Sequence, residues 1–287
     1  IKKITKKTRA IILVHMYGGV CNSRIFKNIS KKYKLKIIED CAESLGAKDQ
    51  NGKLAGTFSD IACWSFQSAK HITCGDGGIL STSNAKYAQR ARKFSNLGFK
   101  FLQPSGDRII VSKKFLQNPS TSRFNLIGYN YRLNEFSAAI ALAQIERLKK
   151  IIYLRRYVSL KMIKEIKKCN FLIAQYLPKK TFSTFYTLSV LISNNRVNWR
   201  KFQKKFVDFG GDSFYAASKV LQDEPSIKKS KFSKCFSYCS KNCVCTPNAK
   251  ILQKKIINFC TNQGSIEDAN EQVVALRKTI NFFNEKI

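Results

Sequence analysis

The sequence has few acidic residues, few histidines and no long apolar run. Only 18 of its 287 residues are Asp or Glu, against 52 Lys and Arg, and two are His. No stretch of eighteen apolar residues occurs, which excludes a membrane-spanning helix. The apolar stretch that follows the basic residues 1–10 is too short for a signal peptide core. We therefore expect a cytoplasmic protein.

The net charge of +34 suggests binding to nucleic acid or to an anionic membrane. However, Lys and Arg are spread along the whole chain, and no nucleic-acid-binding motif accompanies them. We interpret them as solvated surface residues that help to attract an anionic nucleotide diphosphate. A basic nucleic-acid-binding protein is the less favoured alternative.

Ten cysteines stand at irregular spacings. Because the sequence shows no secretion signal, we expect reduced thiols rather than disulfides. One cluster invites a zinc hypothesis, but it lacks the paired C-x-x-C spacing that is typical of zinc sites. Its members are Cys235, Cys239, Cys243 and Cys245.

Hydrophobic periodicity predicts an α/β protein without internal repeats. The expected strands are residues 11–15, 35–39, 61–66, 78–83 and 182–193, and the expected helices are 23–34, 84–95, 134–150, 151–169, 197–209 and 267–283. Strand, helix and strand alternate at the start, which predicts parallel strands with a right-handed crossover. Residues 98–119 and 226–245 are expected to be loops.

Lys70 is the most distinctive residue of the chain. It follows the apolar segment 61–66 and precedes a turn that contains Gly75, Gly77 and Gly78. Burial favours the neutral amine of a lysine, which can form a Schiff base. A solvated lysine at the end of a strand is the simpler alternative.

Two carboxylates follow a neighbouring predicted strand. Asp40 and Glu43 come where one strand ends, as Ser65 and Lys70 come where the next one ends. Ligands of open α/β sheets bind at the carboxyl ends of the strands, so we expect these side chains to share a crevice. A carboxylate facing a lysine-bound heterocycle is what pyridoxal phosphate (PLP) chemistry requires.

Three motifs resemble those of the DegT–StrS family of nucleotide-sugar aminotransferases, which are PLP enzymes. E-D-C-A-E-S-L-G-A at 39–47 is similar to the family's E-D-A-A-[EQ]-x-x-G-A. S-F-Q-S-A-K-H-I-T-C-G-D-G-G at 65–78 is similar to S-F-x-x-x-K-x-[IL]-T-x-G-[ED]-G-G. G-Y-N-Y-R-L at 128–133 is similar to G-[YF]-N-Y-R-[LM]. The motifs stand in the family's order, and the similarity is strong to about Lys150 and looser afterwards.

The resemblance implies PLP transferase fold type I, an aspartate-aminotransferase-like fold. Residues 1–150 are then a partial PLP-binding large domain, and residues 151–287 a small α+β C-terminal domain. Family members carry a further segment before the position of Ile1, which supplies part of the phosphate site and an aromatic residue that stacks on the cofactor. We therefore expect an N-terminally truncated chain.

The resemblance also implies roles for five residues. Lys70 binds PLP as a Schiff base and transfers the proton, and Asp40 pairs with the pyridinium nitrogen. Glu43 lies against the cofactor face or its 3-hydroxyl. Ser65 binds the phosphate, and Asn130 reaches the phosphate of the other subunit in a homodimer with shared active sites. No metal is expected in this site.

The implied reaction transfers an amino group from an amino acid, glutamate as in the family, to a nucleotide-linked 4-keto-6-deoxy sugar. Its product would serve the synthesis of surface polysaccharide. The K-H-I-T sequence at 70–73 and Glu43 favour amination at C4, as in perosamine-synthase-like members. A catalytically inactive truncated relative or partner subunit is the alternative, which the substitutions Cys41, Cys74 and Asn125 motivate.

Overall fold

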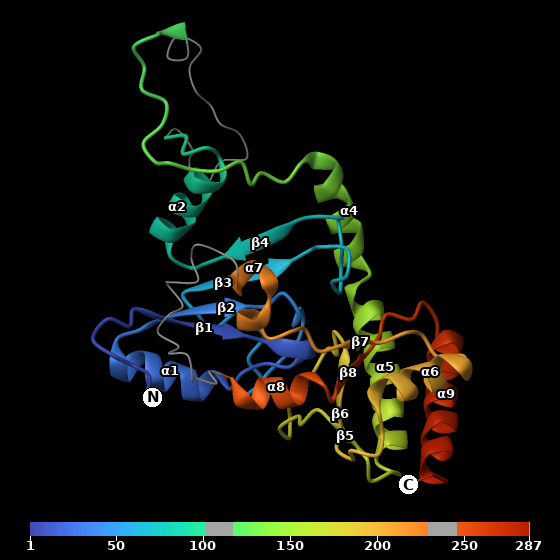
Figure 1. Ribbon diagram of the computed structural model, residues 1–287. Helices are drawn as coiled ribbons and strands as arrows, with labels where there is room; N and C mark the ends of the chain where they lie inside the picture. The colour runs from blue at the N-terminus through green and yellow to red at the C-terminus, as the bar shows by residue number, and fades with distance from the viewer. Residues whose placement is uncertain (101–116, 229–245, 287) are drawn as a thin grey trace. The chain divides into compact units, whose positions relative to one another are not determined.

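The computed structural model describes residues 1–100, 117–228 and 246–286 (Figure 1). The chain forms two compact units. The first consists of Ile1–Leu148 and Lys179–Ser183, and the second of Lys149–Pro178 and Thr184–Ile287. The sequence predicts a boundary between two domains after residue 150, and that boundary stays a prediction.

A four-stranded sheet in the order β1-β2-β3-β4 forms the first unit (Figure 1). Its strands are β1 (Ala10–Val14), β2 (Lys36–Asp40), β3 (Ile61–Ser65) and β4 (Gly78–Ser81). The first three strands are parallel, and β4 is antiparallel to β3. The carboxyl ends of β1, β2 and β3 therefore lie at one edge of the sheet, as the sequence predicts.

Helix α1 (Ser23–Tyr33) connects β1 to β2. The Asn22 side chain caps its start, because it accepts a hydrogen bond from Ile25 N–H at 3.1 Å. Lys34 follows the helix in the left-handed conformation, with φ of 53°. Apolar side chains from the sheet, α1 and neighbouring segments form the core here: Leu13, Ile37 and Phe58, with Val20 and Phe26 against them.

Two more helices of the first unit are α2 (Ala85–Ser95) and α4 (Glu135–Glu146). Helix α4 is predominantly apolar, yet Ala141 is its one buried residue. Phe136 at its start is 85 % exposed. Exposed apolar surface of this extent is typical of a protein–protein interface.

The second unit has an antiparallel sheet in the order β5-β6-β8-β7. Its strands are β5 (Leu172–Ala174), β6 (Leu188–Ile192), β7 (Tyr215–Ala216) and β8 (Ile256–Phe259). Its long helices are α5 (Leu148–Ile166), α6 (Trp199–Asp208) and α9 (Ile266–Asn284), and its short ones are η2 (Leu221–Asp223), α7 (Pro225–Lys228) and α8 (Pro247–Gln253). Phenylalanines dominate the core between sheet and helices: Phe171, Phe202, Phe206, Phe259 and Phe283.

Two of the predicted elements have different bounds in the structure. The predicted helix break after residue 150 lies at Arg147, between α4 and α5. The predicted strand 182–193 is regular only in β6, because Phe185 takes a positive φ of 44° before it. Most of the two predicted loops, and the four clustered cysteines at 235–245, lie outside the described residues.

Among the described helices, none combines the length and the apolar composition that crossing a membrane requires.

Candidate active site

The carboxyl ends of β2 and β3 bring two predicted site residues onto one face of the sheet. In the parallel register Asp40 stands beside Cys63, and Ser65 lies two residues further along β3. Because side chains alternate along a strand, Asp40, Cys63 and Ser65 point to the same face. The two predicted ligands therefore share the edge at which open α/β sheets bind their ligands.

Lys70 lies in the turn that connects β3 to β4. Its backbone N–H donates to the Gln67 carbonyl at 2.9 Å. The loop is closed behind it by Cys74 N–H, which donates to the Phe66 carbonyl at 3.0 Å. The Lys70 side chain is only 17 % exposed, so neighbouring residues cover most of it.

The Glu43 carboxylate faces the amine of Lys70. Glu43 Oε1 lies 3.8 Å from Lys70 Nζ, and the Glu43 side chain is 20 % exposed. Glu43 Oε2 accepts a hydrogen bond from the backbone N–H of Tyr17 at 3.0 Å. The structure thus brings Glu43 and Lys70 together, while their roles stay predictions.

Asp40 and Ser65 keep hydrogen-bonding capacity for a ligand. Asp40 Oδ1 accepts from Ala42 N–H at 3.1 Å, and its other oxygen accepts none from the described part of the chain. Ser65 Oγ accepts from Gln67 N–H at 3.3 Å, which leaves the hydroxyl proton for donation. Together they suit a ligand that offers a protonated ring nitrogen and a phosphate.

Asn130 is positioned by a different part of the first unit. It forms an isolated antiparallel bridge with Asn96, and its Oδ1 accepts from Arg132 Nε at 2.8 Å. Both partners belong to the chain between α2 and α4, not to the ends of β2 and β3. The expected contact of Asn130 with the phosphate of another subunit therefore stays a prediction.

Tyr17 lies near the site, as its place at the end of the first strand predicts, but the sequence assigns it no role. Its backbone is left-handed, with φ of 57° and ψ of 28°, inside the 3-10 turn η1 (Met16–Gly18). This conformation is uncommon for a residue with a Cβ atom, and such strain often occurs at functional sites. The Gly18-Gly19 pair signals a bend, but nothing in the sequence indicates that the preceding tyrosine adopts it.

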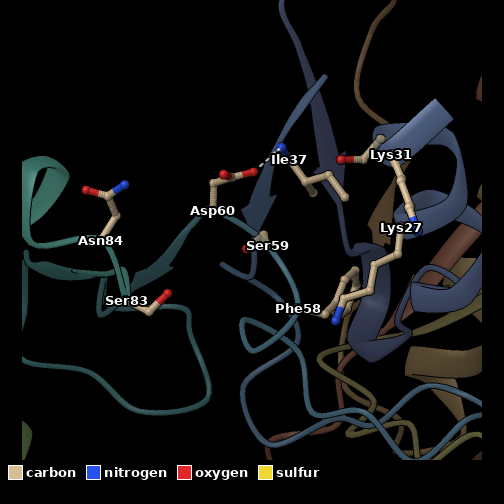
Figure 2. Close-up of a pocket in the computed structure, with 9 residues that line it drawn as sticks. Lys27, Lys31, Ile37, Phe58, Ser59, Asp60, Ser83 and Asn84 are labelled. Carbon is tan, nitrogen blue, oxygen red and sulfur yellow. Dashed lines mark hydrogen bonds between the residues drawn. The ribbon is translucent and has the colours of Figure 1, made fainter. Parts of the chain in front are cut away.

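A separate groove of about 540 Å³ lies at the amino ends of β2 and β3 (Figure 2). Lys27 and Lys31 of α1 line one side, and Asp60 lines the other. Asp60 Oδ2 accepts from Ile37 N–H at 2.9 Å. Because the groove lies at the opposite ends of these strands, it is distinct from the candidate active site.

The chain matches the DegT/DnrJ/EryC1/StrS aminotransferase family over residues 1–275 and belongs to that family. The GDP-perosamine synthase of Escherichia coli O157:H7 is 35 % identical over 191 residues, which are 66 % of this chain and 47 % of the relative. That of Vibrio cholerae is 34 % identical over 158 residues, which are 55 % of this chain and 38 % of the relative. The chain therefore spans less than half the length of these two curated relatives.

Solved structures share the fold. An aminotransferase from Psychrobacter cryohalolentis aligns with a TM-score of 0.78 at 19 % identity, over 98 % of this chain and 70 % of that one. The Escherichia coli GDP-4-keto-6-deoxy-D-mannose-3-dehydratase, which holds hydrated PLP, aligns with 0.76 at 22 % identity, over 97 % and 69 %. The predicted α/β fold of the PLP-dependent transferases is confirmed.

Proposed function

We propose that this protein is a PLP-dependent aminotransferase that acts on a nucleotide-linked 4-keto-6-deoxy sugar. The observation that carries the proposal is the pair formed by Lys70 and Glu43. A half-buried amine faces a carboxylate at the edge of the sheet where Asp40 and Ser65 also lie. An amine in such a site can act as a nucleophile and as a proton carrier.

The residues present fit PLP. The free oxygen of Asp40 is a partner for a protonated ring nitrogen, and the Ser65 hydroxyl is a donor for a phosphate oxygen. Lys70 Nζ is the one group of this set that can bind a carbonyl carbon covalently. When bound, PLP supplies a carbonyl that exchanges the amino group and a ring that accepts electrons.

In this proposal each residue has a defined task. With PLP bound, the Asp40 carboxylate would keep the ring nitrogen protonated. Lys70 Nζ would accept the proton that leaves the α-carbon of the amino donor and would donate it back within the same half-reaction. Glu43 holds the Lys70 amine in place between these steps.

The substrate class is proposed from the relatives. Two of them are named GDP-perosamine synthases, and a structural neighbour is named for a GDP-4-keto-6-deoxy sugar. A keto sugar accepts an amino group, and glutamate is the donor we propose. The high positive charge of the chain favours the approach of an anionic nucleotide diphosphate.

We also propose that the protein works as a homodimer in which Asn130 contacts the cofactor phosphate of the partner subunit. The support is the exposed apolar surface of α4 and of the segment before it. Phe136, Leu142 and Ile140 are 85 %, 62 % and 51 % exposed in the single chain. Covering such side chains removes apolar area from water and stabilises an interface.

An amino-transfer assay tests the proposed activity. The chain is incubated with PLP, ¹⁵N-glutamate and GDP-4-keto-6-deoxymannose, and the sugar nucleotide is analysed by mass spectrometry. The proposal predicts a ¹⁵N-amino sugar with the wild-type chain and none with Lys70→Ala. Equal product in both samples would show that Lys70 is not the reacting lysine. If a sugar nucleotide with its keto group at C3 were aminated and one with its keto group at C4 were not, the C4 assignment would be wrong.

A further inference from the structure

A buried pair of polar residues, His15 and Glu39, lies on the face of the sheet opposite Asp40. Both side chains are 0 % exposed, and His15 Nε2 lies 3.0 Å from Glu39 Oε1. Glu39 Oε1 also accepts from Gly56 N–H at 2.8 Å, and Oε2 accepts from Phe58 N–H at 3.2 Å. Burial raises the pKa of Glu39, but these hydrogen bonds outweigh it, so the pKa is lowered and the group is a carboxylate.

The hydrogen bonds of His15 fix its tautomer. His15 Nδ1 accepts from the backbone N–H of Cys21 at 3.2 Å, so in the neutral ring Nδ1 carries no proton. The ring proton must then be on Nε2, where it is donated to Glu39. Each ring nitrogen of His15 is thus committed to one partner, Cys21 on one side and Glu39 on the other.

The same tautomer argues against a metal ion. Ligand atoms of His15, Glu39 and Cys41 lie within 4.8 Å of one another, a spacing that a metal ion could use. A metal bound at Nε2 would need Nδ1 to carry the proton, and that proton would meet the N–H of Cys21.

Two hydrogen bonds of His15 hold the ends of a turn, residues 16–20. At its start, His15 N–H donates to the Asp40 carbonyl at 3.0 Å and continues the pairing of β1 with β2. At its end, Cys21 N–H binds the His15 ring. Within this turn the strained Tyr17 directs its N–H at Glu43 Oε2. A left-handed tyrosine persists only where the surrounding contacts enforce it.

From this chain of contacts we infer that His15 and Glu39 are positioning residues. They hold the 16–20 turn so that Tyr17 N–H fixes the Glu43 carboxylate beside Lys70. The inference rests on the proposed function for its catalytic meaning, because Lys70 is the proposed reacting group. Its structural core, the dependence of the Tyr17–Glu43 contact on the His15 ring, stands without it.

Two substitutions of His15 separate its two hydrogen bonds. His15→Asn places an amide oxygen near the position of Nδ1 and keeps an acceptor for Cys21 N–H. His15→Gln reaches the position of Nε2 and keeps a donor for Glu39, but loses the bond to Cys21. Asp49→Asn is the control, because Asp49 is buried in the same unit and its carboxylate binds Ser23, which belongs to neither the turn nor the candidate site.

The first measurement is amide hydrogen exchange of Tyr17 and Cys21, which needs no cofactor. We expect His15→Gln to speed exchange of both amides about tenfold, since a hydrogen bond of ordinary strength is lost. His15→Asn and Asp49→Asn should leave the Tyr17 amide within about twofold of wild type. Unchanged Tyr17 exchange in His15→Gln would overturn the inference, as would one equivalent of bound zinc in the purified protein.

The second measurement connects the turn to Lys70. PLP is titrated against each variant, borohydride is added, and the pyridoxyl group on the peptide that contains Lys70 is measured by mass spectrometry. His15→Gln should need about tenfold more PLP for half-maximal labelling than wild type or His15→Asn does. Equal labelling of His15→Gln and wild type would overturn the link to the site. Absence of Lys70 labelling in wild type would instead count against the proposed function, and the exchange result would still decide the structural inference.

Discussion

Glu43 Oε1 lies 3.8 Å from Lys70 Nζ, while Glu43 Oε2 is held by the Tyr17 N–H at 3.0 Å. Glu43→Gln keeps an oxygen for Tyr17 but removes the negative charge beside the amine. We expect amino transfer to fall about tenfold, because Lys70 loses the carboxylate that orients it. Glu43→Ala also loses the Tyr17 contact and should fall further. The measurement is the steady-state rate of wild type and of both variants. Variants that both match wild type would contradict the pairing of Glu43 with Lys70.

Asp40→Asn tests the proposed ring partner. The amide oxygen can still accept from Ala42 N–H, so the local turn should persist. The negative charge that would keep the ring nitrogen protonated is lost. We expect turnover to fall by about a hundredfold or more, with pyridoxyl labelling of Lys70 retained. A variant with normal turnover would remove Asp40 from the proposed site.

Phe136→Asp tests the proposed dimer. Phe136 is 85 % exposed on the apolar helix α4, so a charge there would be buried without a partner in an interface. We expect the mass from light scattering to fall from that of a dimer to that of one chain. Tyr176→Asp is the matched control, because Tyr176 is also 85 % exposed but lies in the second unit. If both variants kept the mass of wild type, the subunit contact would lie elsewhere.

Asp49 makes a prediction about acid stability. Burial would raise its pKa, but hydrogen bonds from Ser23, Asn51 and Lys53 lower it to about 2 from the usual 3.8. A carboxyl group whose pKa is lower in the folded state stabilises that state above pH 4, and this contribution is lost as the pH falls toward 2. The shift corresponds to about 2 kcal/mol of unfolding free energy.

The measurement compares wild type with Asp49→Asn between pH 6 and pH 2. Each unit holds one tryptophan, Trp64 in the first and Trp199 in the second, so a Trp199→Phe background reports the first unit alone. The stability difference between the two proteins should shrink by about 2 kcal/mol as the pH falls. A difference that is constant with pH would contradict the lowered pKa of Asp49.

The parallel sheet could be predicted well from the sequence, because the signals for its strands and helix lie in short stretches of consecutive residues. Apolar runs and the helix between them define β1, α1 and β2, and polar residues follow each strand where ligands bind. Asp40, Glu43, Ser65 and Lys70 could therefore be assigned to one edge before any coordinates. The short strands β5 and β8 were missed, since three or four apolar residues do not separate a strand from a helix.

Contacts between distant residues could not be predicted in the same way. The backbone conformation of Tyr17 depends on Glu43 and on the ring of His15, which only the folded sheet brings near. The pairing of His15 with Glu39 likewise needs the register of β1 against β2. Neither relationship follows from propensity or periodicity, because both are made by tertiary packing.

The most direct test of the central claim is whether PLP binds covalently to Lys70. Purified chain is mixed with PLP, its absorbance spectrum is recorded before and after borohydride, and the labelled peptide is identified by mass spectrometry. The account predicts a band near the visible edge that borohydride removes, with the pyridoxyl group on Lys70, and no such band for Lys70→Ala. Labelling spread over surface lysines to the same extent in both proteins would contradict it.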